Sequence, residues 1–274
     1  MTTMPEVDRG GPLVEGSMLE GTVALVSGIG PGMGRDISLA LAAQGADLVL
    51  GARSEKRTAA VAAEVEAMGR SAIAVTCDIT AREDCDRIVA AARDRFGRLD
   101  VLVNNAFQGG NDTTFAESDL ADWRTTMDVN LFGTLELTQA ALPLLTERDD
   151  SRIVMINTMS VNNIEARFGA YAASKAALAT ATKTLARELG PEGVRVNSVH
   201  PGYIWGRSVE WFMGYLAEQR GVTAEDVYGE LADQTCLGYL PHSQEIAGTV
   251  LYLASPLARP VTGQSINVDC GHWI

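Results

Sequence analysis

A tyrosine and a lysine four residues apart, Tyr171 and Lys175, are the side chains in this sequence best suited to acid–base chemistry. On a helix, this spacing places both side chains on one face, one turn apart. A free tyrosine has a pKa of about 10, and a neighbouring ammonium group favours the phenolate and lowers that pKa. Such a tyrosine can give a proton to a carbonyl oxygen or take one from an alcohol.

A glycine-rich segment, Ser27–Gly34, follows an apolar run and precedes a helical pattern. Glycines at a strand-to-helix turn let backbone amides approach a diphosphate, and the helix N-terminus adds a favourable dipole. The position of this segment between a first strand and a first helix makes it more specific than an isolated glycine cluster. The sequence therefore predicts a dinucleotide site, and such a cofactor carries a hydride.

The elements that must position these residues follow a regular alternation. Short apolar runs, typical of parallel strands covered on both faces, alternate with helical patterns that mostly end at glycine. The runs are Thr22–Ser27, Asp47–Ala52, Ala72–Cys77, Asp100–Asn104, Arg152–Asn157, Arg195–His200 and Gln264–Val268. The helical patterns are Asp36–Gln44, Thr58–Met68, Glu83–Phe96, a segment from Asp119 capped by Ser118, and Tyr171–Leu189. We expect an α/β fold, a single doubly wound Rossmann-type domain whose seven-stranded parallel sheet carries helices on both faces.

Two segments lie outside this alternation. Residues 1–18 combine acidic side chains with Pro and Gly and lack an apolar core, so they predict a flexible arm and no signal peptide. Residues 203–240 hold many aromatic side chains and separate the last two strands, at a sheet end where ligands bind. We expect them to form a substrate lid; the alternative is a helical hairpin that packs on the sheet or on a partner. Residues 19–274 then form one catalytic domain.

Composition excludes several classes of function. The 274 residues carry a net charge of −13, which argues against nucleic acid and anionic membranes as partners. The four cysteines and three histidines show no metal-binding spacing, so no metal site is expected. The sequence has no apolar run long enough to span a membrane. Scattered free cysteines are typical of a reducing compartment, and we expect a cytoplasmic protein.

Taken together, these motifs resemble those of the short-chain dehydrogenase/reductase family, in its single-domain branch. Ser27–Gly34 is similar to that family's TGxxxGxG, and Asn104-Asn105-Ala106 to its NNAG, with Phe107 in place of the last glycine. Tyr171–Lys175 is similar to its YxxxK, and Pro201-Gly202 follows the sixth predicted strand as PG does in the family. The joint order and spacing of these motifs make the resemblance specific.

The resemblance implies catalytic roles for five residues. Tyr171 is the general acid/base, and Lys175 tunes it and holds the nicotinamide ribose. Thr158 lies 13 residues before Tyr171, where the family places a hydroxyl that holds the substrate oxygen. Ser160 is the close alternative if the strand continues that far. Asn130 matches the asparagine that positions a helix kink and a water connected to the lysine.

The resemblance also implies the cofactor contacts. The residues concerned are Ser27, Gly28, Gly32, Met33, Gly34, Asp78, Ile79, Asn104, Ala106, Tyr171, Lys175, Pro201, Gly202 and Ile204. Asp78 is expected at the adenine, with a helix N-cap role as its alternative.

The residues after the second predicted strand bear on the choice of cofactor. NAD-selective sites place an acid there, and this chain has Ala52. Arg53 and Ser54, helped by Lys56 or Arg57, could hold a 2′-phosphate. We therefore expect NADP(H) in preference to NAD(H).

The resulting expectation is an NAD(P)-dependent oxidoreductase that interconverts an apolar or bulky secondary alcohol and its ketone. By resemblance it is a homodimer or homotetramer that pairs the Tyr171–Leu189 helix and its predecessor. Three alternatives remain: a cofactor-binding sensor or scaffold, favoured by Thr158 in place of serine; an enoyl reductase, whose tyrosine and lysine are more widely spaced; and a longer epimerase or dehydratase.

Overall fold

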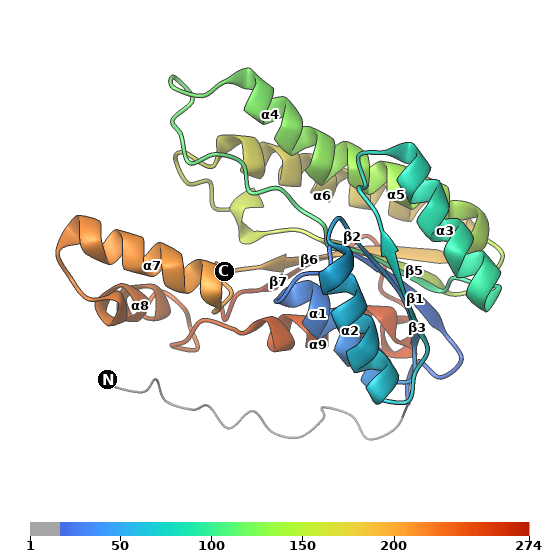
Figure 1. The fold of residues 1–274 in the computed structure, drawn as a ribbon. Helices are drawn as coiled ribbons and strands as arrows, with labels where there is room; N and C mark the ends of the chain where they lie inside the picture. Colours follow the sequence, from blue (N-terminus) through green and yellow to red (C-terminus); the bar gives the residue numbers. More distant parts are fainter. Residues whose placement is uncertain (1–16, 274) are drawn as a thin grey trace.

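A parallel sheet forms the middle layer of the chain in this computed structural model, which describes residues 17–273 (Figure 1). The strand order is β3-β2-β1-β4-β5-β6-β7, and every neighbouring pair is parallel. The strands are β1 (Val23–Ser27), β2 (Asp47–Ala52), β3 (Ala72–Thr76), β4 (Val101–Asn104), β5 (Ser151–Ile156), β6 (Val194–Pro201) and β7 (Ser265–Val268). The predicted fold class is confirmed, and each strand end lies within one residue of the predicted one.

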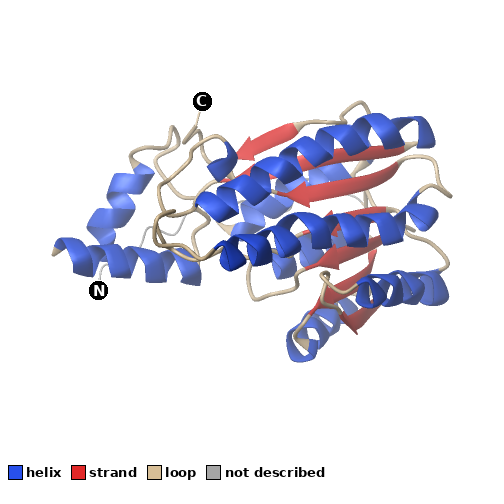
Figure 2. Cartoon of the chain, turned by 90° about the horizontal axis from the view of Figure 1, so that it is seen from above, coloured by secondary structure: helices blue, strands red, loops and turns tan. Residues whose placement is uncertain are grey.

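Helices cover both faces of this sheet (Figures 1 and 2). One face carries α1 (Met33–Ala43), α2 (Glu55–Ala67) and α9 (Ser243–Ala254), and the other carries α3 (Arg82–Phe96), α4 (Leu120–Met127), α5 (Thr134–Leu145) and α6 (Gly169–Leu189). Strand residues alternate between the two cores: Ala24 and Val26 pack with the first set of helices, and Leu25 packs with the second. The helices on both faces explain why most of the strands are apolar over nearly their whole length.

The cap of α4 differs from the prediction. Asp119, not Ser118, is its N-cap, and the Asp119 carboxylate accepts a hydrogen bond from the backbone N–H of Ala121 at 2.8 Å. The Ser118 hydroxyl instead donates to the Phe115 carbonyl at 3.0 Å and accepts from the Trp123 indole at 3.2 Å. These two bonds occupy the hydroxyl, so it is not available to the helix N-terminus.

Most of the predicted N-terminal arm, residues 1–16, lies outside the described residues. Its last two residues, Ser17 and Met18, are hydrogen-bonded to the end of α1. The Ser17 hydroxyl donates to the Gln44 carbonyl at 2.8 Å, and the Met18 N–H donates to the Gln44 side chain at 3.3 Å. Leu19, the next residue, is fully buried.

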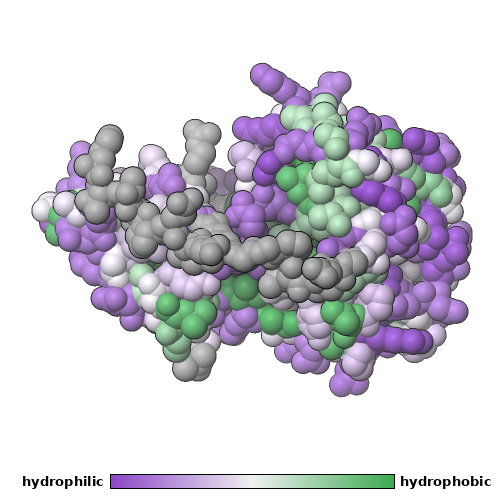
Figure 3. Space-filling model, turned by 90° about the horizontal axis from the view of Figure 1, so that it is seen from below, coloured by the Kyte–Doolittle hydropathy of each residue, from purple (hydrophilic) through white to green (hydrophobic). Residues whose placement is uncertain are grey.

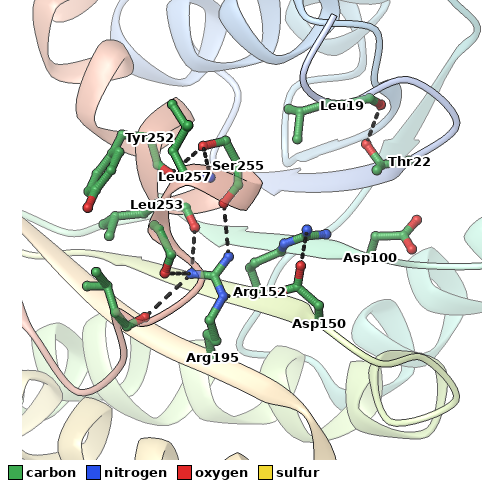
Figure 4. Close-up of polar contacts among 12 residues, drawn as sticks. Leu19, Thr22, Asp100, Asp150, Arg152, Arg195, Tyr252, Leu253, Ser255 and Leu257 are labelled. Carbon is green, nitrogen blue, oxygen red and sulfur yellow. Dashed lines mark hydrogen bonds and ion pairs between the residues drawn. The ribbon is translucent and has the colours of Figure 1, made fainter.

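A buried ionic network joins the amino ends of β5 and β6 (Figure 4). Arg152 and Arg195 are paired in register on these strands, and both donate to the carboxylate of Asp150, at 2.7 and 3.0 Å. The Arg195 guanidinium also donates to four carbonyl oxygens, those of Leu253, Ser255, Ala258 and Val261. Arg195 therefore attaches the end of α9 and the turn after it to the sheet.

Beyond the carboxyl end of β6, residues 203–240 form a helical extension (orange in Figure 1). It contains α7 (Arg207–Arg220) and α8 (Ala224–Ala232). These helices have a small core of their own, made of Met213, Ala217, Val227 and Leu240. Its base is closed where the Trp205 N–H donates to the Pro241 carbonyl at 2.8 Å. The extension thus packs as a unit on the site side of the sheet.

The surface drawn in Figure 3 is largely hydrophilic, and its hydrophobic side chains form separate patches. Among the described residues, no helix has both the length and the hydropathy that crossing a membrane requires. Within residues 17–273, the His, Cys, Asp and Glu side chains form no group of three that could hold a metal ion.

Candidate active site

The loop after β1, Ser27–Gly34, packs closely against the end of β4. Gly28 has φ +76°, and a Cβ added there would lie 2.5 Å from the backbone of Ala106. A Cβ on Gly34 would lie 2.5 Å from the Gly28 carbonyl oxygen, which also accepts a hydrogen bond from the Asn105 amide at 2.8 Å. Only glycine fits at these two positions, because the backbones of two loops approach each other there.

Two adjoining cavities open beyond the carboxyl ends of β1 and β4, where the strand order reverses. Their volumes are about 450 and 670 Å³. They share a wall made of Gly28, Gly30, Pro31, Asn105 and Phe107. Doubly wound sheets bind their ligands at this reversal.

The smaller cavity extends to the beginning of α2. Ala52 ends β2 in its wall, and Arg53, Ser54 and Arg57 follow it there. Lys56 has an exposed side chain and is not part of the wall. Of the four candidates for a 2′-phosphate site, the structure thus brings Arg53, Ser54 and Arg57 together.

Asp78 and Ile79 also line the smaller cavity. The Asp78 carboxylate accepts hydrogen bonds from the Thr80 N–H at 3.0 Å and the Thr80 hydroxyl at 2.8 Å. The alternative role of Asp78 as a helix cap is wrong, because Ala81 occupies the N-cap position of α3. Asp78 instead shapes the turn that follows β3.

The larger cavity contains the predicted catalytic pair. Tyr171 and Lys175 line it together with Gly32, Met33, Gly34, Thr158, Pro201, Gly202 and Ile204. The Lys175 ammonium lies 6.0 Å from the centre of the Tyr171 ring and donates to the Ile156 carbonyl at 2.8 Å.

Burial dominates the protonation of both groups. It lowers the pKa of Lys175 to about 7 and raises the pKa of Tyr171 to about 12. A hydrogen bond with Thr158 opposes the rise at Tyr171. The sequence predicted a lowered pKa for Tyr171, through the nearby ammonium together with an oxidised nicotinamide ring. Without the cofactor, burial disfavours the phenolate, and the Lys175 ammonium donates to Ile156.

Thr158 and Ser160 have different positions. β5 ends at Ile156, and a 3₁₀ turn over Met159–Val161 follows, so the strand does not continue to Ser160. Thr158 lines the larger cavity beside Tyr171, whereas Ser160 is not part of its wall. The Thr158 hydroxyl accepts from the Ser160 N–H and donates to the Ser160 hydroxyl, both at 3.2 Å.

Asn130 lies in a π-helical turn, Asp128–Gly133, that joins α4 to α5. Its side chain is fully buried and forms a hydrogen bond with each backbone polar group of Gln108, at 2.7 and 2.8 Å. The same amide donates to the Ser174 hydroxyl at 2.9 Å. Asn130 therefore connects the loop after β4 with α6, one residue before Lys175.

Two predicted cofactor residues lie behind the cavity walls. The Asn104 amide donates to the Thr138 hydroxyl at 2.9 Å and to the Met155 sulfur at 3.3 Å. The Ser27 hydroxyl accepts from the Asn105 N–H at 3.2 Å. Neither residue lines either cavity, and both support the loops that do.

Sequence reasoning missed Asn157. Its amide donates to the backbone carbonyl of Lys175 at 3.1 Å and its oxygen accepts from the Thr158 N–H at 3.0 Å. The signal for it was a polar residue that ends an apolar run next to a candidate site residue. Gln108 bonds to Asn130 through its backbone N–H and carbonyl, so its side-chain type could not have indicated this role.

The residues of both cavities fit a nicotinamide dinucleotide. The shared wall includes Gly28, whose backbone has no room for a Cβ. A backbone without side chains lets a diphosphate come close to its amide groups. In the smaller cavity, basic and hydroxyl groups line the end near α2. In the larger cavity, the wall includes the hydroxyl groups of Thr158 and Tyr171 and the lysine Lys175.

Comparison with known proteins agrees with this arrangement. The model of a protein family described as enoyl-(acyl carrier protein) reductase matches residues 28–272. Short-chain reductase protein NovJ of Streptomyces niveus is 34% identical, over 91% of this chain and 93% of its own. The chain belongs to the short-chain dehydrogenase/reductase family.

Other short-chain dehydrogenases/reductases match over nearly their whole length. A 3-oxoacyl-[acyl-carrier-protein] reductase of Synechocystis sp. is 35% identical, over 92% of this chain and 97% of that protein. The crystal structure of NAD⁺-bound xylitol dehydrogenase superposes with a TM-score of 0.85 and 25% identity, covering 92% of this chain and 99% of that one. As a short-chain dehydrogenase/reductase, the chain is an NAD(P)-dependent oxidoreductase with a Rossmann fold.

Proposed function

We propose that this short-chain dehydrogenase/reductase interconverts a secondary alcohol and a ketone, with Tyr171 as the general acid/base. One observation carries the proposal: Tyr171, Thr158 and Lys175 line the same cavity, the larger one, beyond the carboxyl ends of the strands. Two hydroxyl groups in one wall can hold a single substrate oxygen between them. The relatives named as a 3-oxoacyl reductase and a xylitol dehydrogenase support a reaction at such a carbon.

A nicotinamide dinucleotide held by the residues of both cavities would supply or accept the hydride. In the reductive direction, Tyr171 gives its proton to the carbonyl oxygen as negative charge develops there. When substrate is bound, the Thr158 hydroxyl turns its proton from the Ser160 hydroxyl to the same oxygen and stabilises that charge. Because burial raises the pKa of Tyr171 to about 12, the phenol keeps its proton at neutral pH, which suits reduction. Asn157 and Asn130 hold α6 in place around Lys175.

We favour NADP(H) over NAD(H) as the cofactor. The wall of the smaller cavity has Ala52 where an acid would bind a ribose hydroxyl, and it has two guanidinium groups, those of Arg53 and Arg57. Arginine binds phosphate with charge-assisted, bidentate hydrogen bonds. A preference for NADP(H) favours the reductive direction.

We infer that the substrate has an apolar or bulky body. Next to Tyr171, the larger cavity is lined by Phe107, Tyr203, Trp205 and Val209. Three of these belong to residues 203–240, which supports a lid role for that extension. We expect the chain to form a homodimer or homotetramer, as its resemblance to the family implies.

The test is a panel of saturated ketones, secondary alcohols and enones, assayed with each cofactor by nicotinamide absorbance. Turnover of a saturated ketone or secondary alcohol supports the proposal. Turnover of enones alone favours an enoyl reductase, whose description the matching family carries. Tight cofactor binding without turnover of any compound favours the sensor or scaffold.

A further inference from the structure

Tyr203 is a residue of the larger cavity whose ring and hydroxyl are both held by residues outside the cavity wall. It follows Pro201-Gly202 at the end of β6 and lines the cavity with Tyr171. Its hydroxyl donates to the Glu165 carboxylate at 2.7 Å. Its ring stacks on Phe212 with an interplanar angle of 14° and a centroid distance of 6.4 Å. A side chain fixed at both its ring and its hydroxyl presents a constant surface to a ligand.

The partner Glu165 belongs to a loop that is itself fixed. Two residues further on, Arg167 donates to the Asp112 carboxylate at 2.6 Å and to the Asp112 carbonyl at 2.8 Å. Arg167 has φ +78°, a left-handed backbone that these two bonds help to hold. Asp112 lies in the loop after β4, so the Asp112–Arg167 and Glu165–Tyr203 contacts join three loops in series around the cavity.

The same contacts leave the ring of Tyr203 with few alternative orientations. His272 lies on it as well, with ring centroids 6.0 Å apart. A flexible apolar chain gains little from a flat, rigid wall, because it must give up its own conformational freedom to lie on it. A rigid cyclic substrate can pack against the same wall without that loss.

We propose that Tyr203 is a specificity-determining residue that favours cyclic ketones and alcohols over linear ones, and that Glu165 is its positioning residue. This inference rests on the proposed function, since it concerns the substrate of the same reaction. Glu165 acts only through Tyr203: its carboxylate accepts the phenolic hydrogen bond and so sets the plane of the ring.

The experiment compares two neutral ketones of equal carbon number, the bicyclic 1-tetralone and the linear 2-decanone, with the full chain and saturating NADPH. Tyr203→Leu should lower kcat/KM for 1-tetralone about tenfold and that for 2-decanone no more than about twofold. Tyr215→Leu is the matched control, because Tyr215 lies on α7 outside the cavity wall and stacks on Trp211. It should leave both ketones unchanged.

The role of Glu165 is tested by two substitutions. Glu165→Ala should raise KM for 1-tetralone with little change in kcat, because the ring loses its orientation but the reacting groups stay. Glu165→Gln should restore KM, since the amide oxygen accepts the same hydrogen bond. Equal changes for Gln and Ala would overturn the positioning role.

A second readout separates this inference from the proposed function. The dissociation constant of 1-tetralone is measured by tryptophan fluorescence for the wild type and Tyr203→Leu. Weaker binding in the variant supports the inference, whatever the turnover. The inference would be overturned if Tyr203→Leu lowered kcat/KM equally for 1-tetralone and 2-decanone, or if it bound 1-tetralone as tightly as the wild type does. The proposed function would still stand. A wild type that turns over no ketone or alcohol at all would overturn the proposed function instead.

Discussion

The buried ammonium of Lys175 donates a hydrogen bond to the carbonyl oxygen of Ile156, 2.8 Å away at the end of β5. The return contact runs from the Asn157 amide to the Lys175 carbonyl at 3.1 Å. These two bonds join the catalytic helix to the end of β5 and to Asn157, the residue before Thr158. The separation between Tyr171 and Thr158 is thereby fixed by contacts to backbone carbonyl groups.

The buried lysine predicts a pH-dependent stability. Its folded pKa of about 7 lies below the value of an unfolded lysine, so between about pH 7 and pH 10 the unfolded chain binds a proton that the folded chain lacks. The free energy of unfolding of the wild type, relative to Lys175→Met, should therefore rise with pH across this window. Urea unfolding of the cofactor-free proteins measures it. Lys56→Met, at an exposed site, is the control. If the difference in free energy of unfolding between the wild type and Lys175→Met does not change with pH, the low pKa of Lys175 is contradicted.

Removal of the phenolic hydroxyl should almost abolish turnover. Tyr171→Phe keeps the ring in the cavity wall and deletes the proton donor, so the rate should fall by a factor on the order of 10²–10⁴. Cofactor affinity, measured by titration of nicotinamide fluorescence, should stay close to that of the wild type. Activity within a few-fold of the wild type would remove Tyr171 from the chemistry.

Thr158 and Ser160 should respond differently to loss of the hydroxyl. Thr158→Val keeps the shape and removes the donor, so kcat/KM should fall by a factor on the order of 10²–10³. Thr158→Ser should retain much of the activity. Ser160→Ala should matter far less, because Ser160 is not part of the cavity wall. Steady-state kinetics of the three variants provide the measurement. An inactive Ser160→Ala protein together with an active Thr158→Val protein would show that Ser160, not Thr158, holds the substrate oxygen.

The choice of cofactor should depend on Arg53. Arg53→Ala should weaken NADPH binding about tenfold or more and leave NADH almost unaffected, because a charge-assisted hydrogen bond to phosphate is lost. Lys56→Ala is the matched control, since this neighbouring cation lies outside the cavity wall. Calorimetric titration with both cofactors provides the measurement. Equal losses for NADPH and NADH would show that Arg53 does not read the phosphate.

Most strands were predictable because helices on both faces make them apolar over nearly their whole length, so each of these runs in the sequence has clear ends. The motif residues of the site were predictable for a similar local reason, as with Gly28 and Gly34, whose backbones admit no side chain. Asn104 shows the limit of a motif. Asn104 and Asn105 adjoin in sequence, but the first is directed into the core behind the wall and the second lines both cavities.

Contacts between distant loops left no pattern in the sequence. Glu165 and Tyr203 are separated by 38 residues and meet only because the loops after β5 and β6 lie side by side. The raised pKa of Tyr171 in the cofactor-free protein was not predictable for the same reason, since it depends on burial and on where the Lys175 ammonium points. Both require the three-dimensional arrangement.

The arginine network on β5 and β6 lies at the amino ends of these strands, whereas every cavity residue lies at or beyond the carboxyl ends. Arg195 anchors the turn after α9 without touching the site. In evolutionary terms, residues that set substrate choice are separate from residues that hold the fold together. Substitutions around Tyr203 can change the substrate while Arg195 still keeps the sheet assembled. Directed evolution of this chain can therefore concentrate its libraries on one rim of the sheet and leave the opposite rim untouched.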